Sequence, residues 1–152
     1  MLQVDIAPER PITVAVELAS QAPGPLDTVV VPVGGGGLVA GIALWLRRHH
    51  PRVRIVGAEP LGAASMTAAL AAGGPVALPE VDTFVDGAAV GRVGSLTYPV
   101  VRDLVDEVVT VTDEEISRAL LMLLERGKLV VEPAGSVGVA ALLAGAAEVT
   151  KP

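Results

Sequence analysis

Hydrophobic residues recur along the first part of the chain with two spacings, and each spacing predicts a different element. Apolar positions three and four residues apart predict a helix over 13–21, which the Pro-Gly-Pro sequence at 23–25 ends. The β-branched run at 28–33 (TVVVPV) lacks alternation, which is typical of a parallel strand buried on both faces. Residues 38–50 then predict a helix, and 53–58 a second buried strand. This order of strand, helix and strand indicates a βαβ unit.

The middle of the chain predicts a helix of small residues, a long irregular segment and a third strand. Small apolar residues at 63–72 favour a helix, and prolines and glycines interrupt every pattern over 75–94. Helical spacing resumes over 98–105, and 107–111 (EVVTV) predicts a strand. The irregular segment is a candidate functional loop, because binding residues concentrate in loops.

The last part of the chain predicts two more helices. Thr112 and Glu115 have the spacing of a capping box, which predicts the start of a helix that ends near Arg126. Residues 128–131 predict a short extended segment. The sequence at 132–136 (EPAGS) then reads as a loop that leads into a final helix of small residues.

No repeat, low-complexity tract or linker interrupts this alternation, so we expect residues 1–152 to form a single α/β unit. Hydrophobic residues make up 51% of the chain and the mean hydropathy is +0.60. The apolar mass is Ala, Val and Leu, because Phe, Trp and Tyr occur once each. Such a surplus predicts apolar surface that is left for a partner and favours a homo-oligomer.

Charge, cysteine content and the N-terminal sequence exclude several classes of protein. Seventeen acidic and eleven basic side chains give a net charge of −6, and the arginines are scattered, which argues against nucleic acid as a partner. Without cysteine there is no disulfide, thiolate metal site or cysteine nucleophile. The uncharged stretch 28–46 has a proline and four glycines at its middle, so no membrane span is expected. Because the N-terminus lacks the order of a signal peptide, we expect a cytoplasmic enzyme.

The strongest chemical signal is a run of four glycines, Gly34, Gly35, Gly36 and Gly37, between the first strand and a helix that begins at Leu38. Successive glycine N–H groups at a helix N-terminus form a cradle for an anion, because no side chain blocks their approach. Four glycines in an ordinary turn would cost conformational entropy without return. The loop therefore predicts a phosphate or carboxylate site.

Spacing alone leaves two phosphate compounds open. Gly35, Gly37 and Ala40 also satisfy the loose dinucleotide pattern G-x-G-x-x-A, and Glu59 ends the next predicted strand nineteen residues later. An acid in that place binds a ribose in dinucleotide-binding folds. A small dinucleotide-binding domain is therefore one hypothesis for this chain.

Five motifs in order along the chain resemble the fold-type II pyridoxal-phosphate enzymes of the threonine dehydratase (threonine ammonia-lyase) and serine racemase family. They are VPVGGGGLVAG (31–41), EP (59–60), FVDGAAVG (84–91), DEVVTVT (106–112) and VEPAG (131–135). The resemblance covers nearly the full length of the chain. It implies the C-terminal, large-domain part of the tryptophan synthase beta-like fold, a three-layer α/β architecture whose mostly parallel sheet is flanked by helices.

The resemblance also implies a cofactor site for pyridoxal 5'-phosphate. Main-chain N–H groups from Gly34 to Leu38 would hold the cofactor phosphate, and the loop at Asp86 and Gly87 would lie close to the pyridine ring. Glu132 matches a family acid near the cofactor, where its carboxylate would accept a hydrogen bond from an amine or hydroxyl.

A cation site is the second binding site that the resemblance implies. Glu59 matches a position that helps to bind a cation in serine racemase-like members, and Ala63 would offer a carbonyl oxygen. Ser65 stands where the family has a further acid. A hard divalent ion prefers several oxygen ligands, so the loss of a charged one weakens the predicted site.

Two groups of the family site do not match this sequence. Family members use a lysine upstream of all five motifs to form a Schiff base with the cofactor, whereas the lysines here are Lys128 and Lys151. A Ser/Cys-Gly-Gly-Asn strand against the pyridine nitrogen would follow Pro152. No residue is therefore assigned as catalytic, and we expect about half of a dehydratase with an altered start at 1–11.

The function implied by the resemblance is that of a threonine or serine ammonia-lyase, which converts the amino acid to its 2-oxo acid and ammonia by β-elimination. Racemisation is the neighbouring activity. An alternative from another class is a non-catalytic module that completes a separately encoded N-terminal half.

Overall fold

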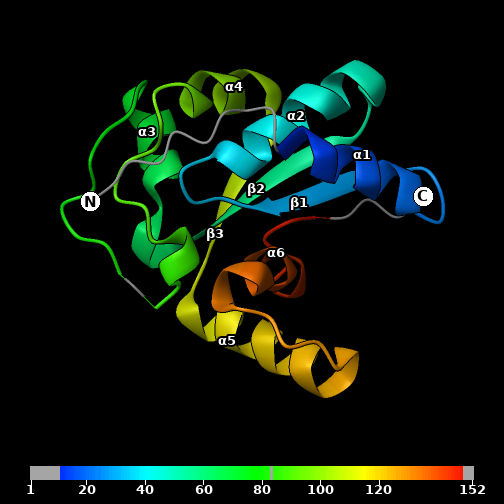
Figure 1. Ribbon diagram of the computed structural model, residues 1–152. Coiled ribbons are helices and arrows are strands. Elements are labelled where there is room, and N and C mark those ends of the chain that lie inside the picture. The colour runs from blue at the N-terminus through cyan, green and yellow to red at the C-terminus, as the bar shows by residue number, and fades with distance from the viewer. Residues whose placement is uncertain (1–10, 83, 149–152) are drawn as a thin grey trace.

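A parallel three-stranded sheet forms the centre of the chain (Figure 1). The computed structural model describes residues 11–82 and 84–148. The strands are β1 (Thr28–Pro32), β2 (Arg54–Pro60) and β3 (Glu107–Val111), in the order β1-β2-β3. Both pairs are parallel, which confirms the βαβ unit predicted from the sequence.

Helices cover both faces of the sheet, as Figure 1 shows. One face carries α1 (Pro11–Gln21), α2 (Gly37–His49) and α4 (Thr97–Leu104), and the other carries α5 (Asp113–Met122) and α6 (Pro133–Leu143). The predicted three-layer α/β architecture is confirmed. The expectation about residues 1–11 lies, apart from Pro11, outside the described residues.

Each layer of helices closes a separate hydrophobic core against the sheet. Val29 and Val31 of β1 point into the core under α2, whereas Val30 between them packs against the core under α6. The central strand β2 is buried from Ile55 to Pro60. A strand with apolar neighbours on both sides needs side chains of the same kind at every position, which explains the lack of alternation.

The connection from β2 to β3 contains the irregular segment that the sequence predicts over 75–94, between two helices. The connection begins with the 3₁₀ turn η1 (Leu61–Ala63) and the helix α3 (Ser65–Ala72), and a second 3₁₀ turn, η2 (Asp86–Ala88), follows before α4.

The predicted capping box at the start of α5 is confirmed. The Thr112 hydroxyl accepts a hydrogen bond from the Glu115 N–H, and the Glu115 side chain accepts one from the Thr112 N–H.

Three details after α5 differ from the prediction. The helix continues as a π-helical turn, η3 (Leu123–Gly127), rather than as α-helix to its predicted end near Arg126. Lys128 then takes a left-handed conformation with φ of 56°, so the first residue of the predicted extended segment is not extended. The predicted loop at 132–136 was wrong for its last four residues, which form the first turn of α6. Pro133 suits this first helical position because its missing N–H would have no partner there.

A network of hydrogen bonds locks the amino ends of the strands. The Arg47 side chain donates hydrogen bonds to Asp106, to the Leu104 carbonyl and to the Val53 carbonyl, at 2.5, 2.9 and 2.7 Å. Asp106 also accepts a bond of 2.7 Å from the Ile55 N–H.

Over residues 11–82 and 84–148, no helix has both the length and the apolar character that crossing a membrane requires.

Glu59, near the end of β2, holds the first turn of α3 through its buried carboxylate. One carboxylate oxygen accepts from the Met66 N–H at 2.7 Å, and the other accepts from the Thr67 N–H and hydroxyl at 2.8 and 2.7 Å. Burial raises the pKa of Glu59 above its usual value, although these hydrogen bonds act in the opposite direction. The carboxylate thus replaces the side-chain cap that α3 lacks at its own N-terminus.

The raised pKa of Glu59 predicts a pH-dependent contribution to stability. Glutamate in an unfolded chain titrates near about pH 4.3, so as pH rises above that value the folded protein ionises Glu59 less readily than the unfolded chain does. The free energy of unfolding of the wild type should therefore fall, relative to that of Glu59→Gln, as pH rises through the raised pKa. Urea unfolding of both proteins from about pH 4 to about pH 8 measures this difference. A wild type whose free energy of unfolding rises relative to that of Glu59→Gln over this pH range would contradict the prediction.

Candidate functional site

The candidate site lies at the carboxyl edge of the sheet. Residues 33–36 follow β1 at this edge, η1 follows β2, and Thr112 follows β3. Because the strands are parallel, these three connections emerge on the same side of the molecule. Open parallel sheets bind their ligands in this position.

The glycine loop turns sharply from β1 into α2. Val33, the last residue before the loop, donates a hydrogen bond of 2.8 Å to the Ala58 carbonyl, which holds it to β2. Gly36 precedes the first turn of α2 with φ of 85°, a conformation that favours glycine. The loop is therefore a fixed turn whose shape requires glycine at this residue.

The loop presents a row of main-chain N–H groups without acceptors. The first hydrogen bond of α2 runs from the Ala40 N–H to the Gly36 carbonyl at 3.0 Å, so the N–H groups of residues 37–39 precede it. Those of residues 34–36 donate no hydrogen bond to any described residue. Consecutive donors at a helix N-terminus form an anion-binding cradle, as the sequence predicts.

Two of the glycines leave no room for a side chain. A Cβ atom on Gly34 would lie 3.2 Å from the Ala88 Cα, and one on Gly36 would lie 2.7 Å from the Met66 Cε. A Cβ atom on Gly35 would meet no atom within 4 Å. The backbone at Gly34 and Gly36 is thus packed against its neighbours, while Gly35 borders open space.

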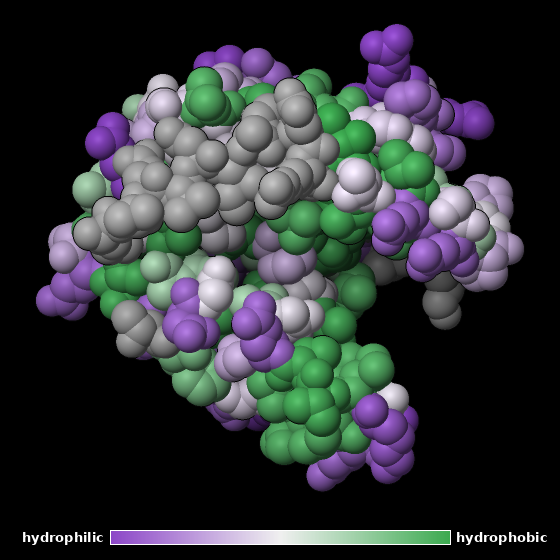
Figure 2. Space-filling model, viewed as in Figure 1, coloured by the Kyte–Doolittle hydropathy of each residue, from purple (hydrophilic) through white to green (hydrophobic). Residues whose placement is uncertain are grey.

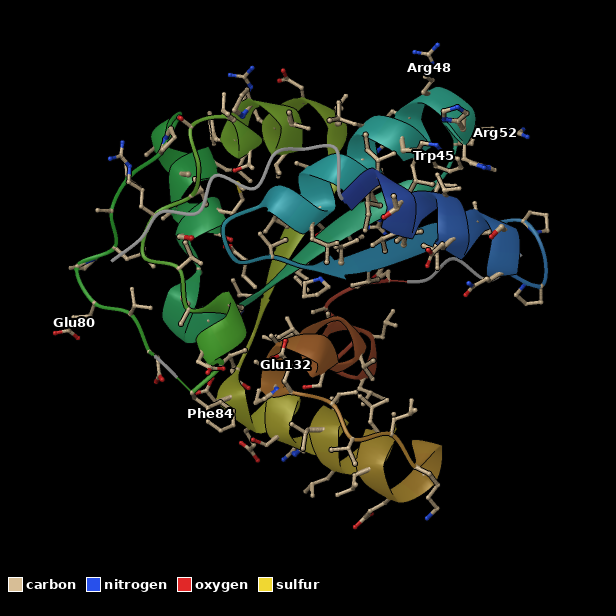
Figure 3. All side chains as sticks on the ribbon, viewed as in Figure 1. Trp45, Arg48, Arg52, Glu80, Phe84 and Glu132 are labelled. Carbon is tan, nitrogen blue, oxygen red and sulfur yellow. The ribbon has the colours of Figure 1, made fainter. Side chains whose placement is uncertain are left out.

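The structure brings the Asp86-Gly87 turn and Glu132 together beside this loop. A Cβ atom on Gly87 would lie 3.0 Å from the Ala134 Cβ and 3.4 Å from a Glu132 carboxylate oxygen. Ala88, the next residue, is the one that packs on Gly34. Figure 3 shows Glu132 at the start of α6, on the same side of the molecule as Phe84.

Glu132 is held at the start of α6 with its carboxylate unengaged. It is the residue before the first turn, and Gly135 donates a hydrogen bond of 2.9 Å to its main-chain carbonyl. Its side chain is exposed, does not cap the helix, and accepts no hydrogen bond within the part of the chain that the structure describes. A carboxylate in this position is available to a ligand that carries an amine or hydroxyl.

The Glu59 carboxylate is buried and held by α3. The side chain is fully buried, and both of its oxygens accept hydrogen bonds from α3. Glu59 is therefore not available to bind a ribose, which removes the acidic residue that the dinucleotide hypothesis requires. Ala63 is buried nearby in the chain, and the buried Ser65 hydroxyl has no hydrogen-bond partner among the described residues. Within 11–82 and 84–148, no group of three His, Asp or Glu side chains could hold a metal ion. The cation stays a prediction.

The remaining reactive side chains serve structural roles. The Lys128 ammonium is exposed and donates to the Glu125 carbonyl at 2.7 Å, while Lys151 lies outside the described residues. His49 stacks on Trp45 at 4.4 Å between ring centroids, and Figure 3 shows Trp45 far from Glu132. The buried Ser136 hydroxyl donates to the Pro133 carbonyl at 2.8 Å within α6.

The sequence analysis did not identify Thr97 and Met66, which contact the glycine loop. Thr97 donates a hydrogen bond of 2.7 Å from its hydroxyl to the Gly35 carbonyl, and Met66 covers Gly36. Thr97 lies 62 residues from Gly35 along the chain. No local pattern marks such a contact, so only the tertiary structure reveals it.

Comparison with known proteins agrees with this geometry. The family model described as "Pyridoxal-phosphate dependent enzyme" matches residues 7–152. An L-threonine ammonia-lyase from Geobacter sulfurreducens is 49% identical over 131 residues, which are 86% of this chain and 32% of that protein. A serine racemase from Oryza sativa subsp. indica is 44% identical over 131 residues, which are 86% of this chain and 38% of that protein.

A solved structure is similar to this chain in both fold and sequence. The processed form of threonine deaminase isoform 2 from Solanum lycopersicum superposes with a TM-score of 0.82 at 40% identity, over 86% of this chain and 38% of that one. The chain thus spans about a third of the length of the curated relatives that it matches. Its motifs, its fold and its match to the family model agree, and the chain belongs to the family of pyridoxal-phosphate dependent enzymes.

Proposed function

We propose that this chain holds the phosphate of pyridoxal 5'-phosphate on the main-chain N–H groups from Gly34 to Leu38. The observation that carries the proposal is the row of unpaired donors at the start of α2, inside a loop with no side chains. The residues present fit a phosphate ester, because a doubly charged anion can accept several N–H donors at once and gains from the helix dipole. The cofactor requirement of the family points to the same ligand.

Asp86, Gly87 and Glu132 form the second wall of the proposed site. Gly87 packs on the start of α6 without room for a side chain, and the Asp86 carboxylate accepts a hydrogen bond of 2.8 Å from the Gly87 N–H. Glu132 would accept a hydrogen bond from an amine or hydroxyl of the bound molecule. These residues bind and orient, and none of them is proposed as the catalytic base.

The activity that we propose for the whole protein is that of a threonine or serine ammonia-lyase, which forms a 2-oxo acid and ammonia by β-elimination. The relatives named threonine ammonia-lyase support this reading, and those named serine racemase keep racemisation as the alternative. The bound cofactor would supply an electron sink that makes the α-proton of the amino acid acidic. The contribution of this chain is to fix the cofactor phosphate and to close one side of the site.

A cation beside Glu59 and Ala63 is a further proposal. Its structural support is the Ser65 hydroxyl, which is buried without a hydrogen-bond partner among the described residues. Buried polar atoms are usually satisfied, and an oxygen-bound cation would satisfy this one. A cation would compete with α3 for the Glu59 carboxylate, so we expect weak binding.

Another polypeptide is proposed to cover the apolar surface at the end of α5. This surface, termed the leucine surface, consists of Leu121, Leu124, Leu129 and Val130, and Val130 is 90% exposed. Figure 2 shows it as a continuous hydrophobic lobe at the bottom of the molecule.

A second apolar feature is a groove of about 400 Å³ beside the open edge of β1. It is lined by Thr28, Val30, Pro32, Gly135, Gly138, Val139 and Leu142. Surfaces of this kind favour a second copy of the chain or a separate N-terminal half.

Binding of pyridoxine 5'-phosphate tests the phosphate site directly. This compound carries the ring and phosphate of the cofactor but no aldehyde, so a surface lysine cannot capture it. We expect binding that inorganic phosphate competes away and that NAD does not. Calorimetric titration of the purified chain measures both, and preferential binding of NAD would contradict the proposal.

A negative charge placed in the loop should weaken this binding. Gly35→Asp adds a carboxylate where a side chain meets no neighbour, and Gly35→Asn is its neutral match in size. Repulsion between the carboxylate and the phosphate should weaken binding by about tenfold or more for Asp relative to Asn. Equal affinities of the two variants would contradict a phosphate at this loop.

The leucine surface predicts self-association of the chain. Sedimentation equilibrium of the wild type should report a species larger than the monomer, and Leu121→Lys should weaken association by about tenfold or more because it places a charge in the contact. Leu61→Lys is the matched control, since Leu61 is 57% exposed and Leu121 is 53% exposed but Leu61 lies outside the surface. A wild type that remains monomeric would overturn self-association.

A further inference from the structure

The Gly35 peptide is fixed by a side chain from α4. The Thr97 hydroxyl lies 2.7 Å from the Gly35 carbonyl oxygen and 3.1 Å from the Gly94 carbonyl oxygen. A hydroxyl has one proton to donate, and the distance to the Gly35 oxygen is the shorter of the two. Each carbonyl also accepts from a main-chain N–H, Gly94 from Tyr98 at 3.1 Å and Gly35 from Gly94 at 3.5 Å. The geometry therefore assigns the Thr97 proton to the Gly35 carbonyl.

This hydrogen bond also determines where the next N–H group points. The Gly35 carbonyl and the Gly36 N–H belong to one planar peptide unit, which is trans because the described residues contain no cis peptide bond. In a trans peptide the C=O and N–H bonds point in opposite directions. A carbonyl held toward Thr97 thus aims the Gly36 N–H away from α4.

Packing around Gly36 restricts the same peptide. A Cβ atom on Gly36 would lie 2.7 Å from the Met66 Cε, 3.0 Å from the Thr97 hydroxyl oxygen and 3.1 Å from the Thr97 Cβ atom. Met66 is itself held by the hydrogen bond from its N–H to Glu59 at 2.7 Å. The loop cannot turn its peptide over without displacing both neighbours.

We propose that Thr97 is a positioning residue of the phosphate loop, whose hydroxyl holds the Gly35 peptide so that the Gly36 N–H faces the phosphate. The inference rests on the proposed phosphate site and adds a residue from a distant helix to it. Its consequence is that the donors are oriented before the ligand arrives, so binding does not have to pay for turning the peptide.

Three substitutions at Thr97 separate the hydroxyl from the rest of the side chain. Thr97→Val and Thr97→Ala lack the hydroxyl, and Thr97→Ser keeps it. Pyridoxine 5'-phosphate and inorganic phosphate should bind about three- to tenfold more weakly to the Val and Ala variants, and within about twofold of wild type to the Ser variant. Weakening by the same factor in all three would overturn the proposal, because it would assign the effect to packing.

A measurement without ligand tests the positioning separately from the binding. In NMR spectra of the full chain, loss of the hydrogen bond should move the carbonyl carbon of Gly35 and the amide of Gly36 in the Val and Ala variants, and the Ser variant should retain the wild-type positions. Unchanged resonances in the Val and Ala variants would overturn the role of Thr97. Failure of the wild type to bind either phosphate compound would instead refute the proposed phosphate site, and these resonances would still decide whether Thr97 holds the peptide.

Discussion

The site depends on main-chain N–H groups at the start of α2 that meet no acceptor among the described residues. The buried strand β1 ends against a helix start, and the turn between them leaves no side chain to satisfy these donors. An anion is the natural partner for such a row, because it neutralises the positive end of the helix and accepts several hydrogen bonds. The glycines serve this purpose in two ways, since Gly36 needs its left-handed conformation and Gly34 needs its close contact with Ala88.

The site is assembled from segments that lie far apart in the sequence. Gly34 packs on the turn after Val85, Gly87 packs on the start of α6, and the Gly35 carbonyl accepts from Thr97 of α4. The parallel sheet makes these contacts possible, because it delivers every strand end to the same edge. The hydrogen bonds of Arg47 lock the opposite edge, so the strand ends cannot slide relative to one another.

Local patterns predicted most of the helices and strands, but they could not predict the contacts between them. The third strand at 107–111 and the capping box at Thr112 were predicted correctly because the pattern that indicates each one lies within a few consecutive residues. The first turn of α6 at 133–136 was missed because Pro133 and Gly135 resemble a loop until the helix packs. The burial of Glu59 and the role of Thr97 arise from tertiary contacts that no spacing in the sequence records.

We propose above all that the loop from Gly34 to Leu38 holds the phosphate of the cofactor. Amide shift mapping of the full chain with pyridoxal 5'-phosphate tests it most directly, because each main-chain N–H group reports its own hydrogen bond. We expect the largest shifts at residues 34–38, with smaller ones at Gly87. Shifts that centre on Lys128, or an unchanged glycine loop at saturating cofactor, would contradict it.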